Sequence, residues 1–412
     1  MLPSVYAPLA NGTEWQIWIL RDNGDRLATL VRGTGEYGQR VENFVTTYSN
    51  LSTSQQATGD LAVSFEYASV LNNIGWFRLT LPGSFDRRVL RKDNRVVFWR
   101  KPVGGAGGIA FMGFIRSNRT RLDRNGNVLR VVEGKDLNYL LSSRVVAYPA
   151  GHARADQTDQ ADDLMKSLVD ENLGANSLTA GGRAVAANVS STYFSVQADA
   201  AAGPSITKGM SYRNVLDVLR ELADAARAAG TEVYFGIVPT GESTFEFRTK
   251  TGQWGQDLTS DVANGLTFGP EYGNMGAAEL VEDATDEVNY AYGLGQGQGS
   301  QRTYSTSADA TRTGASLWAI REGKVDARGD ATAAGVLDAA DAELVKGRPL
   351  AYATAELLSV PGSIYGKDWN FGDRVTLAID GRQADALVRY VRVSVDERGY
   401  ETIEPLLESY LT

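Results

Sequence analysis

The sequence predicts an α+β protein that is mainly β, built as a β unit, a smaller α/β unit and a second β unit. Many segments alternate apolar and polar residues with the period of a strand. Three segments, all after residue 150, instead repeat apolar residues with the period of a helix. The 412 residues include 44 Gly, which suits strands joined by tight turns, and the length exceeds that of one ordinary core.

The first unit, residues 1–150, is expected to contain only strands and loops. In the run at 14–20, Trp15, Ile17 and Ile19 share one face, and Asp22-Asn-Gly24 follows as a hairpin turn because Asn-Gly tolerates a positive φ. Residues 33–60 are rich in Gly, Thr, Ser, Asn and Gln and predict a long loop or arm. Further strands are expected at 27–31, 76–81, 95–100, 109–115, 119–122 and 128–132.

The second unit, residues 151–260, is expected to be α/β, and the third, residues 261–412, to be β with one helix. Ser211 is the candidate N-cap of the second unit's stronger helix, and Gly230 ends that helix. The predicted helices span 159–173, 212–229 and 331–346. The predicted strands span 232–238, 244–248, 374–379, 386–395 and 400–403.

Composition excludes several kinds of site. The chain has no Cys, so it has no disulfide, no thiolate metal site and no Cys nucleophile. It has one His, His152, so multi-His metal sites are excluded as well. No stretch reaches the roughly 18 apolar residues of a membrane helix, and the start lacks the features of a secretory signal. We expect no cofactor, no metal and no membrane-spanning segment.

Charge is divided unevenly along the chain. Residues 1–150 carry 19 Lys and Arg against 12 Asp and Glu, which leaves 22 and 38 for the rest, so a net +7 is followed by a net −16. This asymmetry suggests that the two ends face different partners. The basic surplus predicts an interface with an acidic partner, unless these residues are only solvated strand ends. The candidate interface residues are Arg87, Arg88, Arg91, Lys92 and Arg95.

Four local patterns resemble chemical sites but are better explained structurally. The Gly run at 293–299 lacks both the third glycine of a dinucleotide fingerprint and a following helix, which favours a strand exit or a close packing point. The Asp residues at 156–163 lack the order of a calcium loop and suit the first turn of a helix. Asp283, Asp286 and Glu287 could pair as hydrolase carboxylates, and His152 could be a base, but nothing local completes either site.

Four segments stand out by their order and spacing along the chain. They are WILRDNGDRLA at 18–28, GWFRLTLP at 75–82 with FMGFI at 111–115, GKDLNYLLSSRVVAYP at 134–149 and PGSIYGKDWNFGDRVT at 361–376. The last segment contains Gly372-Asp373 and leads into a late strand. Gly372 can adopt a positive φ there and Asp373 can accept a backbone N–H two residues on, which makes the pair a candidate structural turn. Together the segments resemble one family, the hub or tail-tip proteins of long-tailed bacteriophages.

The resemblance implies two tail-tube-like β-barrel domains, at 1–150 and 261–412, with the α/β domain at 151–260 between them. It also implies a homotrimeric ring that closes the tail tube, adapts sixfold to threefold symmetry and leaves a channel for non-specific passage of DNA. The implied partners are a distal tail or tail-tube ring, the tape-measure protein, and central fibre or receptor-binding proteins. The implied location is the virion tail tip, after synthesis in the bacterial cytoplasm.

The resemblance favours a structural protein that is not an enzyme. Many relatives continue into a peptidase, lysozyme-like or fibre domain, whereas this sequence ends at residue 412, so a wall-degrading role is not expected. Two other functions stay open from the residues themselves. One is a β-rich polysaccharide or cell-wall hydrolase that uses Asp283 or Glu287. The other is a monomeric carbohydrate-binding adhesion module.

Overall fold

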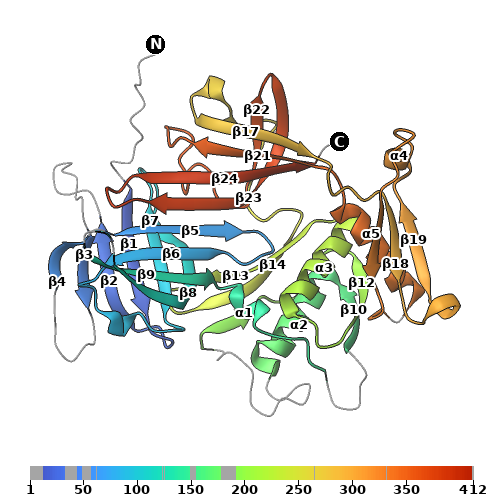
Figure 1. Cartoon of the computed structure of the whole chain (residues 1–412), viewed down its shortest axis with the longest axis horizontal. Helices are drawn as coiled ribbons and strands as arrows, with labels where there is room; N and C mark the ends of the chain where they lie inside the picture. The colour runs from blue at the N-terminus through green and yellow to red at the C-terminus, as the bar shows by residue number, and fades with distance from the viewer. Residues whose placement is uncertain are drawn as a thin grey trace.

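Strands from both ends of the chain lie in one sheet. The computed structural model describes residues 13–32, 44–48, 57–61, 63–122, 124, 126–148, 155–177, 192–263, 265–330 and 332–410. The main sheet has 16 strands and joins the N-terminal and C-terminal β units where β23 pairs with β5 (Figure 1). In spatial order its main path is β17 (Met275–Asp283), β21 (Leu350–Leu357), β24 (Glu401–Tyr410), β23 (Arg382–Val395), β5 (Ser64–Val70), β6 (Trp76–Pro82), β9 (Val128–Asp136), β8 (Gly108–Leu122), β7 (Arg95–Lys101), β1 (Glu14–Leu20), β2 (Arg26–Arg32), β3 (Phe44–Tyr48) and β4 (Ala57–Leu61).

The second β unit adds a short branch to this sheet. β22 (Arg374–Ile379) pairs antiparallel with β23, and β15 (Asp257–Leu258) and β16 (Thr267–Phe268) pair parallel with β22. The fold is therefore mainly β, as predicted. Among the described strand pairings, the sheet runs as an open path from β17 to β4 and no pairing closes it into a barrel.

The N-terminal hairpin is buried on both faces. Ile17 and Ile19 point into the core that the two β units share, whereas Trp18 and Leu20 on the opposite face pack against the α/β unit. β1 and β2 are joined by the predicted turn, in which Gly24 adopts a φ of +91°. Both faces of β1 can be apolar because a second layer covers the face that would otherwise meet solvent.

The α/β unit covers this second face with two helices and five strands. α2 (Ala161–Asn172) and α3 (Val215–Ala228) place their apolar stripes against Trp18 and Val97 of the first unit in one core. Buried Asn72 and Asn138 bind the backbone of β13: their side-chain oxygens accept the N–H groups of Phe235 and Ile237 at 2.8 and 2.7 Å. The strands are β10 (Ala155–Gln160) with β12 (Ser205–Met210), and β11 (Phe194–Val196), β14 (Phe245–Thr251) and β13 (Val233–Pro239).

A small outlying unit is inserted between β17 and β21. It consists of β18 (Tyr290–Leu294), β19 (Tyr304–Ala308), β20 (Glu322–Asp326), α4 (Ala310–Thr313) and α5 (Ala333–Lys346). α5 packs against α3 of the α/β unit, and Figure 1 shows the whole insertion at the far end of the molecule from β1–β4. Gly293 is a close packing point, as the sequence suggested, because a Cβ there would lie 2.2 Å from the Val336 oxygen of α5.

Several predicted elements need correction. Residues 33–60 are not a continuous loop, because β3 and most of β4 lie within this range. The strands predicted at 109–115 and 119–122 are one strand, β8, which bends at an irregularity between Ile115 and Ser117. The N-cap of α3 is Asn214, whose side chain accepts from the Leu216 N–H, and not Ser211. The strands predicted at 14–20 and 374–379 match β1 and β22 residue for residue, and the remaining predicted helices and strands are present with shifted ends. β5, β10–β12 and β15–β21 were not predicted.

Candidate partner-binding surfaces

The basic segment between β6 and β7 is an exposed turn of 3-10 helix. Arg87 and Arg88 lie in the turn Arg87–Val89, and the buried Val89 anchors it to the core of the first unit. The Asp86 side chain caps the turn by accepting the Arg88 N–H and also binds the Arg88 guanidinium at 2.6 Å. No ion pair is recorded for Arg87 or Arg91 within the described residues, so these two cations face solvent.

Arg95 does not belong to this surface. Its side chain is 1% exposed and donates to the carbonyl oxygens of Ser243 and Arg21, which joins the first unit to the α/β unit. Burial lowers the pKa of Arg95. Its place in the candidate interface was therefore wrong, because a sequence with many arginines does not tell which of them points inward. Arg87, Arg88, Arg91 and Lys92 are exposed.

Arg100, another residue of the basic surplus, is also buried and ties the two β units together. It donates to Glu401 Oε1 at 2.7 Å and to the Tyr365 carbonyl at 2.6 Å, and the two charged side chains are 3% and 9% exposed. Glu401 begins β24 and Arg100 lies near the end of β7, so the pair crosses the core between the units. A buried pair of this kind holds its partners in one geometry, because either charge alone in the core is costly.

The Gly372-Asp373 turn is present and reaches further than predicted. Gly372 has a φ of +86°, and a Cβ added there would lie 2.3 Å from the Trp254 ring. Asp373 is 2% exposed; its Oδ1 accepts the Gln256 N–H and its Oδ2 the Asn370 N–H, each at 2.6 Å. The carboxylate thus binds a residue three positions earlier, not two positions later, and fastens the chain entering the second β unit to the start of β22.

A cavity of about 170 Å³ lies where the three units meet. Its lining includes Asp136 at the end of β9, Phe235 of the α/β unit and Phe371 of the second β unit. Asp136 Oδ1 is buried and has no hydrogen-bond partner among the described residues. Burial raises the pKa of Asp136 to about 7, although the backbone N–H groups of Gly75 and Asn138 favour the charged form. The site holds a carboxyl group that changes charge near neutral pH.

Among the described residues, the two most exposed large apolar side chains lie on one loop of the outlying unit, which the sequence analysis did not identify. Residues 316–321, here called the apolar loop, connect α4 to β20 and carry Leu317, Trp318 and Ile320 at 95%, 81% and 61% exposure. Single exposed apolar residues are ordinary, but three large ones on one short loop mark an interaction site. The only signal in the sequence was the short run LWAI, which is too short to show a strand or helix period.

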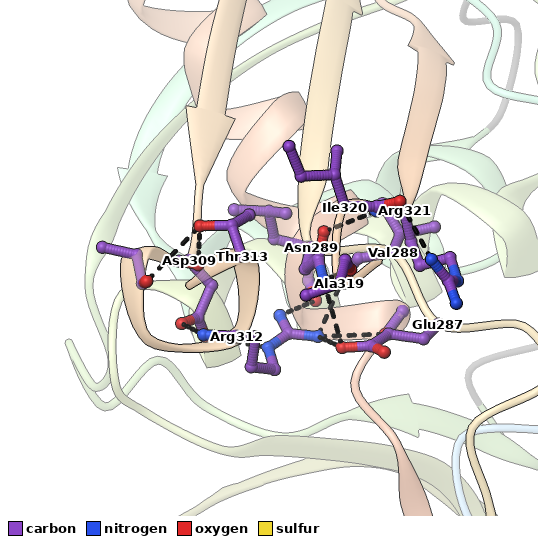
Figure 2. A network of polar contacts seen from close by, with 12 residues as sticks. Glu287, Val288, Asn289, Asp309, Arg312, Thr313, Ala319, Ile320 and Arg321 are labelled. Carbon is purple, nitrogen blue, oxygen red and sulfur yellow. Dashed lines mark hydrogen bonds and ion pairs between the residues drawn. The ribbon is translucent and has the colours of Figure 1, made fainter. Parts of the chain in front are cut away.

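The apolar loop is held in a fixed shape by a polar network beneath it (Figure 2). Buried Asn289 donates to the Ala319 carbonyl at 2.7 Å and accepts the Arg321 N–H at 2.8 Å, so its amide clamps both sides of Ile320. Arg312 of α4 bonds Asp309 at 2.9 Å and Glu287 at 3.3 Å. Arg312 also donates to carbonyls at the C-terminal end of α5, where a cation is favourable.

Two of the candidate catalytic residues, Asp283 and Glu287, have bonding partners within the same unit. Asp283 is exposed and accepts the Thr285 N–H at 2.8 Å, whereas Glu287 is engaged by Arg312. Asp162 and Asp163 lie in the first turn of α2, as predicted, where they are buried and accept backbone N–H groups of residues 200–202. His152 lies outside the described residues.

In the part of the chain that the structure describes, no group of three or more His, Asp or Glu residues is placed to hold a metal ion. No helix there is long and apolar enough to cross a membrane.

Comparison with known proteins identifies the family. The model of a family described as Siphovirus ReqiPepy6 Gp37-like protein matches residues 48–407. The chain belongs to this family. No curated protein sequence matches it. The family resemblance expected from the sequence is therefore confirmed.

Two solved structures share the fold over nearly their whole length. One is a tail protein from Neisseria meningitidis MC58, with 14% identity, a TM-score of 0.53 and 97% of each chain covered. The other is the 43 kDa tail protein of prophage MuSo2 from Shewanella oneidensis, with 13% identity, a TM-score of 0.54, and 96% of this chain and 98% of that chain covered. This Gp37-like protein therefore has the fold of phage tail proteins.

Proposed function

We propose that this protein is a structural hub subunit of a siphophage tail tip. In the proposal three copies form a ring that closes the tail tube, adapts sixfold to threefold symmetry and anchors receptor-binding or penetration proteins. Genome and tape-measure protein pass through its channel. The observation that carries the proposal is the agreement in fold with two tail proteins over nearly the full length of all three chains.

The way the β units are joined supports a load-carrying role. The β23–β5 strand pairing and the buried Arg100–Glu401 ion pair connect the first and last β units directly, so the two units are expected to move together. Within the proposal, residues 1–150 and 261–412 supply two tube-like β domains and residues 151–260 decorate the ring. The protein works by geometry and not by catalysis, and we place it at the virion tail tip after synthesis in the host cytoplasm.

The exposed basic segment is proposed as the contact with the neighbouring tail ring. Arg87 and Arg91 lack ion pairs within the described residues, and the core-anchored Val89 holds them in place. An acidic surface on a distal tail or tail-tube protein would complement them. The Gly372-Asp373 turn is proposed as a structural element of the second β domain and not as a contact.

Oligomeric state tests the proposal directly. Mass photometry of the purified chain and negative-stain imaging of assembled tails should reveal a three-copy ring with a central channel at the tip. Threefold closure satisfies cyclic symmetry with one repeated interface. A chain that stays monomeric at high concentration, and that occupies isolated positions in assembled tails, would overturn it.

A further inference from the structure

The apolar loop is built to bind a protein. Trp is enriched among the residues that dominate binding energy, and Leu317 and Ile320 flank it with apolar surface. Asn289 binds the loop backbone at Ala319 and Arg321, and Arg312 binds the carbonyl of Val288, the neighbour of Asn289. The loop backbone is therefore held before any partner arrives, so little conformational entropy is lost on binding. The exposures of 95%, 81% and 61% mean that no described part of the same chain covers the three side chains.

The charge of the outlying unit favours a protein partner over an anionic membrane or a nucleic acid. Residues 282–348, which contain the outlying unit, hold 11 Asp and Glu against 7 Lys and Arg, a net of −4. An anionic membrane surface or a nucleic acid would be repelled by this unit. Within the apolar loop the only charged residue is Arg321, which is exposed and donates to the Trp318 and Ile320 carbonyls, so its positive charge lies beside the three apolar side chains. The matching surface is therefore an apolar groove with acidic walls on a protein.

The chain carries such a groove elsewhere. A groove of about 540 Å³ lies over β17, β21, β23 and β24, and Ala277, Ala278, Pro405 and Leu406 form its apolar lining. Four charged residues also line it. Glu279 and Glu356 are exposed and form no ion pair with the described residues, whereas Arg392 is paired with Glu404 and with Glu66, so the groove is acidic on balance. Irregularities in β17 before Ala278 and in β23 before Tyr390 interrupt the regular register beside it, and such bulges re-aim side chains.

The geometry points to a contact between copies: we propose that the apolar loop of one subunit enters the β17–β24 groove of the next. This inference rests on the proposed ring and names the residues that close it. Two complementary patches at different places on one surface make a head-to-tail interface, which closes into a ring when the rotation allows. Trp318 and Leu317 fill the apolar floor, and Arg321 meets Glu279 and Glu356.

Because the chain has no Cys, only cysteines introduced by mutation can form a disulfide, so a crosslink identifies the contact directly. One full-length variant carries Trp318→Cys and another carries Ala278→Cys; the two are mixed and oxidised, in solution and in assembled tails. The expected product is a disulfide-linked pair that contains one chain of each kind. Leu122→Cys replaces Trp318→Cys in the control, because Leu122 is also exposed but lies at the tip of β8, and its mixture should stay uncrosslinked.

Self-association provides a second measurement. Trp318→Ala should weaken it about thirtyfold, the size of a central hot spot. Arg321→Glu and Glu356→Arg should each weaken it, and the chain that carries both should regain most of the loss because the charges again oppose each other. Melting temperatures of these variants should match the wild type, since all three side chains are exposed.

The outcomes separate this inference from the proposed function. A wild-type ring with no loop-to-groove disulfide, and with unchanged association of Trp318→Ala, would overturn the inference and leave the hub in place. A specific disulfide in a chain that never forms a three-copy ring would support the contact and overturn the hub. A disulfide equally frequent in the Leu122→Cys control, or a monomer without any disulfide, would also overturn the inference.

Discussion

At the scale of single residues, Asp373 shows how one carboxylate can fix the start of a domain. Asp373→Ala removes the acceptor of both the Gln256 and the Asn370 N–H groups, which lie in a buried region. Two hydrogen bonds to a charged group contribute about 1.5–3 kcal/mol each, or about 3–6 kcal/mol together. Removing the buried carboxylate also removes its desolvation cost, which raises the pKa of Asp373, so we expect the unfolding free energy to fall by about 2–4 kcal/mol. Asp286→Ala, at an exposed carboxylate without a recorded bond among the described residues, is the matched control and should change it by less than about 0.5 kcal/mol.

The neighbouring Gly372 tests the same turn through the backbone. Gly372→Val forces a branched residue to a φ of +86° and drives its Cβ into the Trp254 ring. We expect a loss of more than about 1 kcal/mol from backbone strain. Thermal melts of both variants, together with counts of complete tails, measure the effects. Unchanged melting in both would mean that the turn is dispensable.

Asp136 gives the protein a pH dependence near neutrality. Because burial raises the pKa of Asp136 to about 7, the folded chain holds a proton there that the unfolded chain releases near pH 4. Stability from this group is therefore complete below about pH 4 and is lost as pH rises to about 7, by roughly 4 kcal/mol in total. Asp136→Asn should remove this dependence of the unfolding free energy on pH. Relative to the wild type, the variant should therefore be more stable at pH 8 than it is at pH 5. Urea unfolding of the wild type and of Asp136→Asn at pH 5 and pH 8 measures these free energies. If the free energy changes by the same amount between the two pH values in both proteins, the prediction is contradicted.

The sequence predicted some of these residues and not others for a physical reason. Gly372 and Asp373 were found because turn chemistry is local. The link from Asp373 to Gln256 was not, since it spans 117 residues. Arg95 and Arg91 are four positions apart in one basic run, yet the first is buried and the second exposed. Only the tertiary packing that surrounds each residue separates them.

At the scale of elements, the hairpin β1–β2 and helices α2 and α3 were predictable because their apolar periods are strong. β3 and β4 were not, because FVTTY and ATGDL show no clear alternation. They are strands because β2 offers an edge to β3, which in turn pairs with β4. Strand propensity depends on such neighbours more than on the segment itself.

The pair between β7 and β24 gives an element-scale prediction. Glu401→Ala leaves the Arg100 guanidinium buried without its counter-ion, and such a loss costs about 3–5 kcal/mol. Lys101→Ala, which breaks the exposed Lys101–Glu14 pair beside it, should cost at most about 1 kcal/mol. Replacing Arg100 and Glu401 together by Met should recover most of the loss. Denaturant titrations of the four proteins measure this, and equal losses for Glu401→Ala and Lys101→Ala would contradict it.

At the scale of the whole molecule, the order β, α/β, β along the chain was predictable but the joining of its parts was not. No periodicity indicates that β5 pairs with β23, because Glu66 and Arg392 face each other across more than 300 residues. The helix of the third unit, α5, packs against α3 of the second unit. Dividing the chain into consecutive units does not predict this contact. Leu317 and Trp318, the most exposed large apolar side chains among the described residues, lie in this unpredicted insertion.

The charge division of the chain leads to a prediction about assembly. Only Arg87 and Arg91 in the basic segment are exposed without a recorded ion pair among the described residues, whereas Arg88 supports the Asp86 cap. We expect Arg87→Glu with Arg91→Glu to block joining to the neighbouring tail ring without unfolding the chain. Rim charges act mainly on the association rate and its salt dependence, so the defect should change with ionic strength.

A control variant with the same change in net charge separates the effect of the basic segment itself from the effect of total charge. Arg121→Glu with Arg374→Glu also lowers the net charge by four, at exposed positions in β8 and β22 that form no ion pair with the described residues. Counts of complete tails at low and high salt should fall for the Arg87 and Arg91 variant and stay near wild type for the control. Normal assembly of the first variant at every salt concentration would reject the basic segment as an interface. Equal defects in both would mean that assembly responds to total charge, as long-range repulsion between subunits requires.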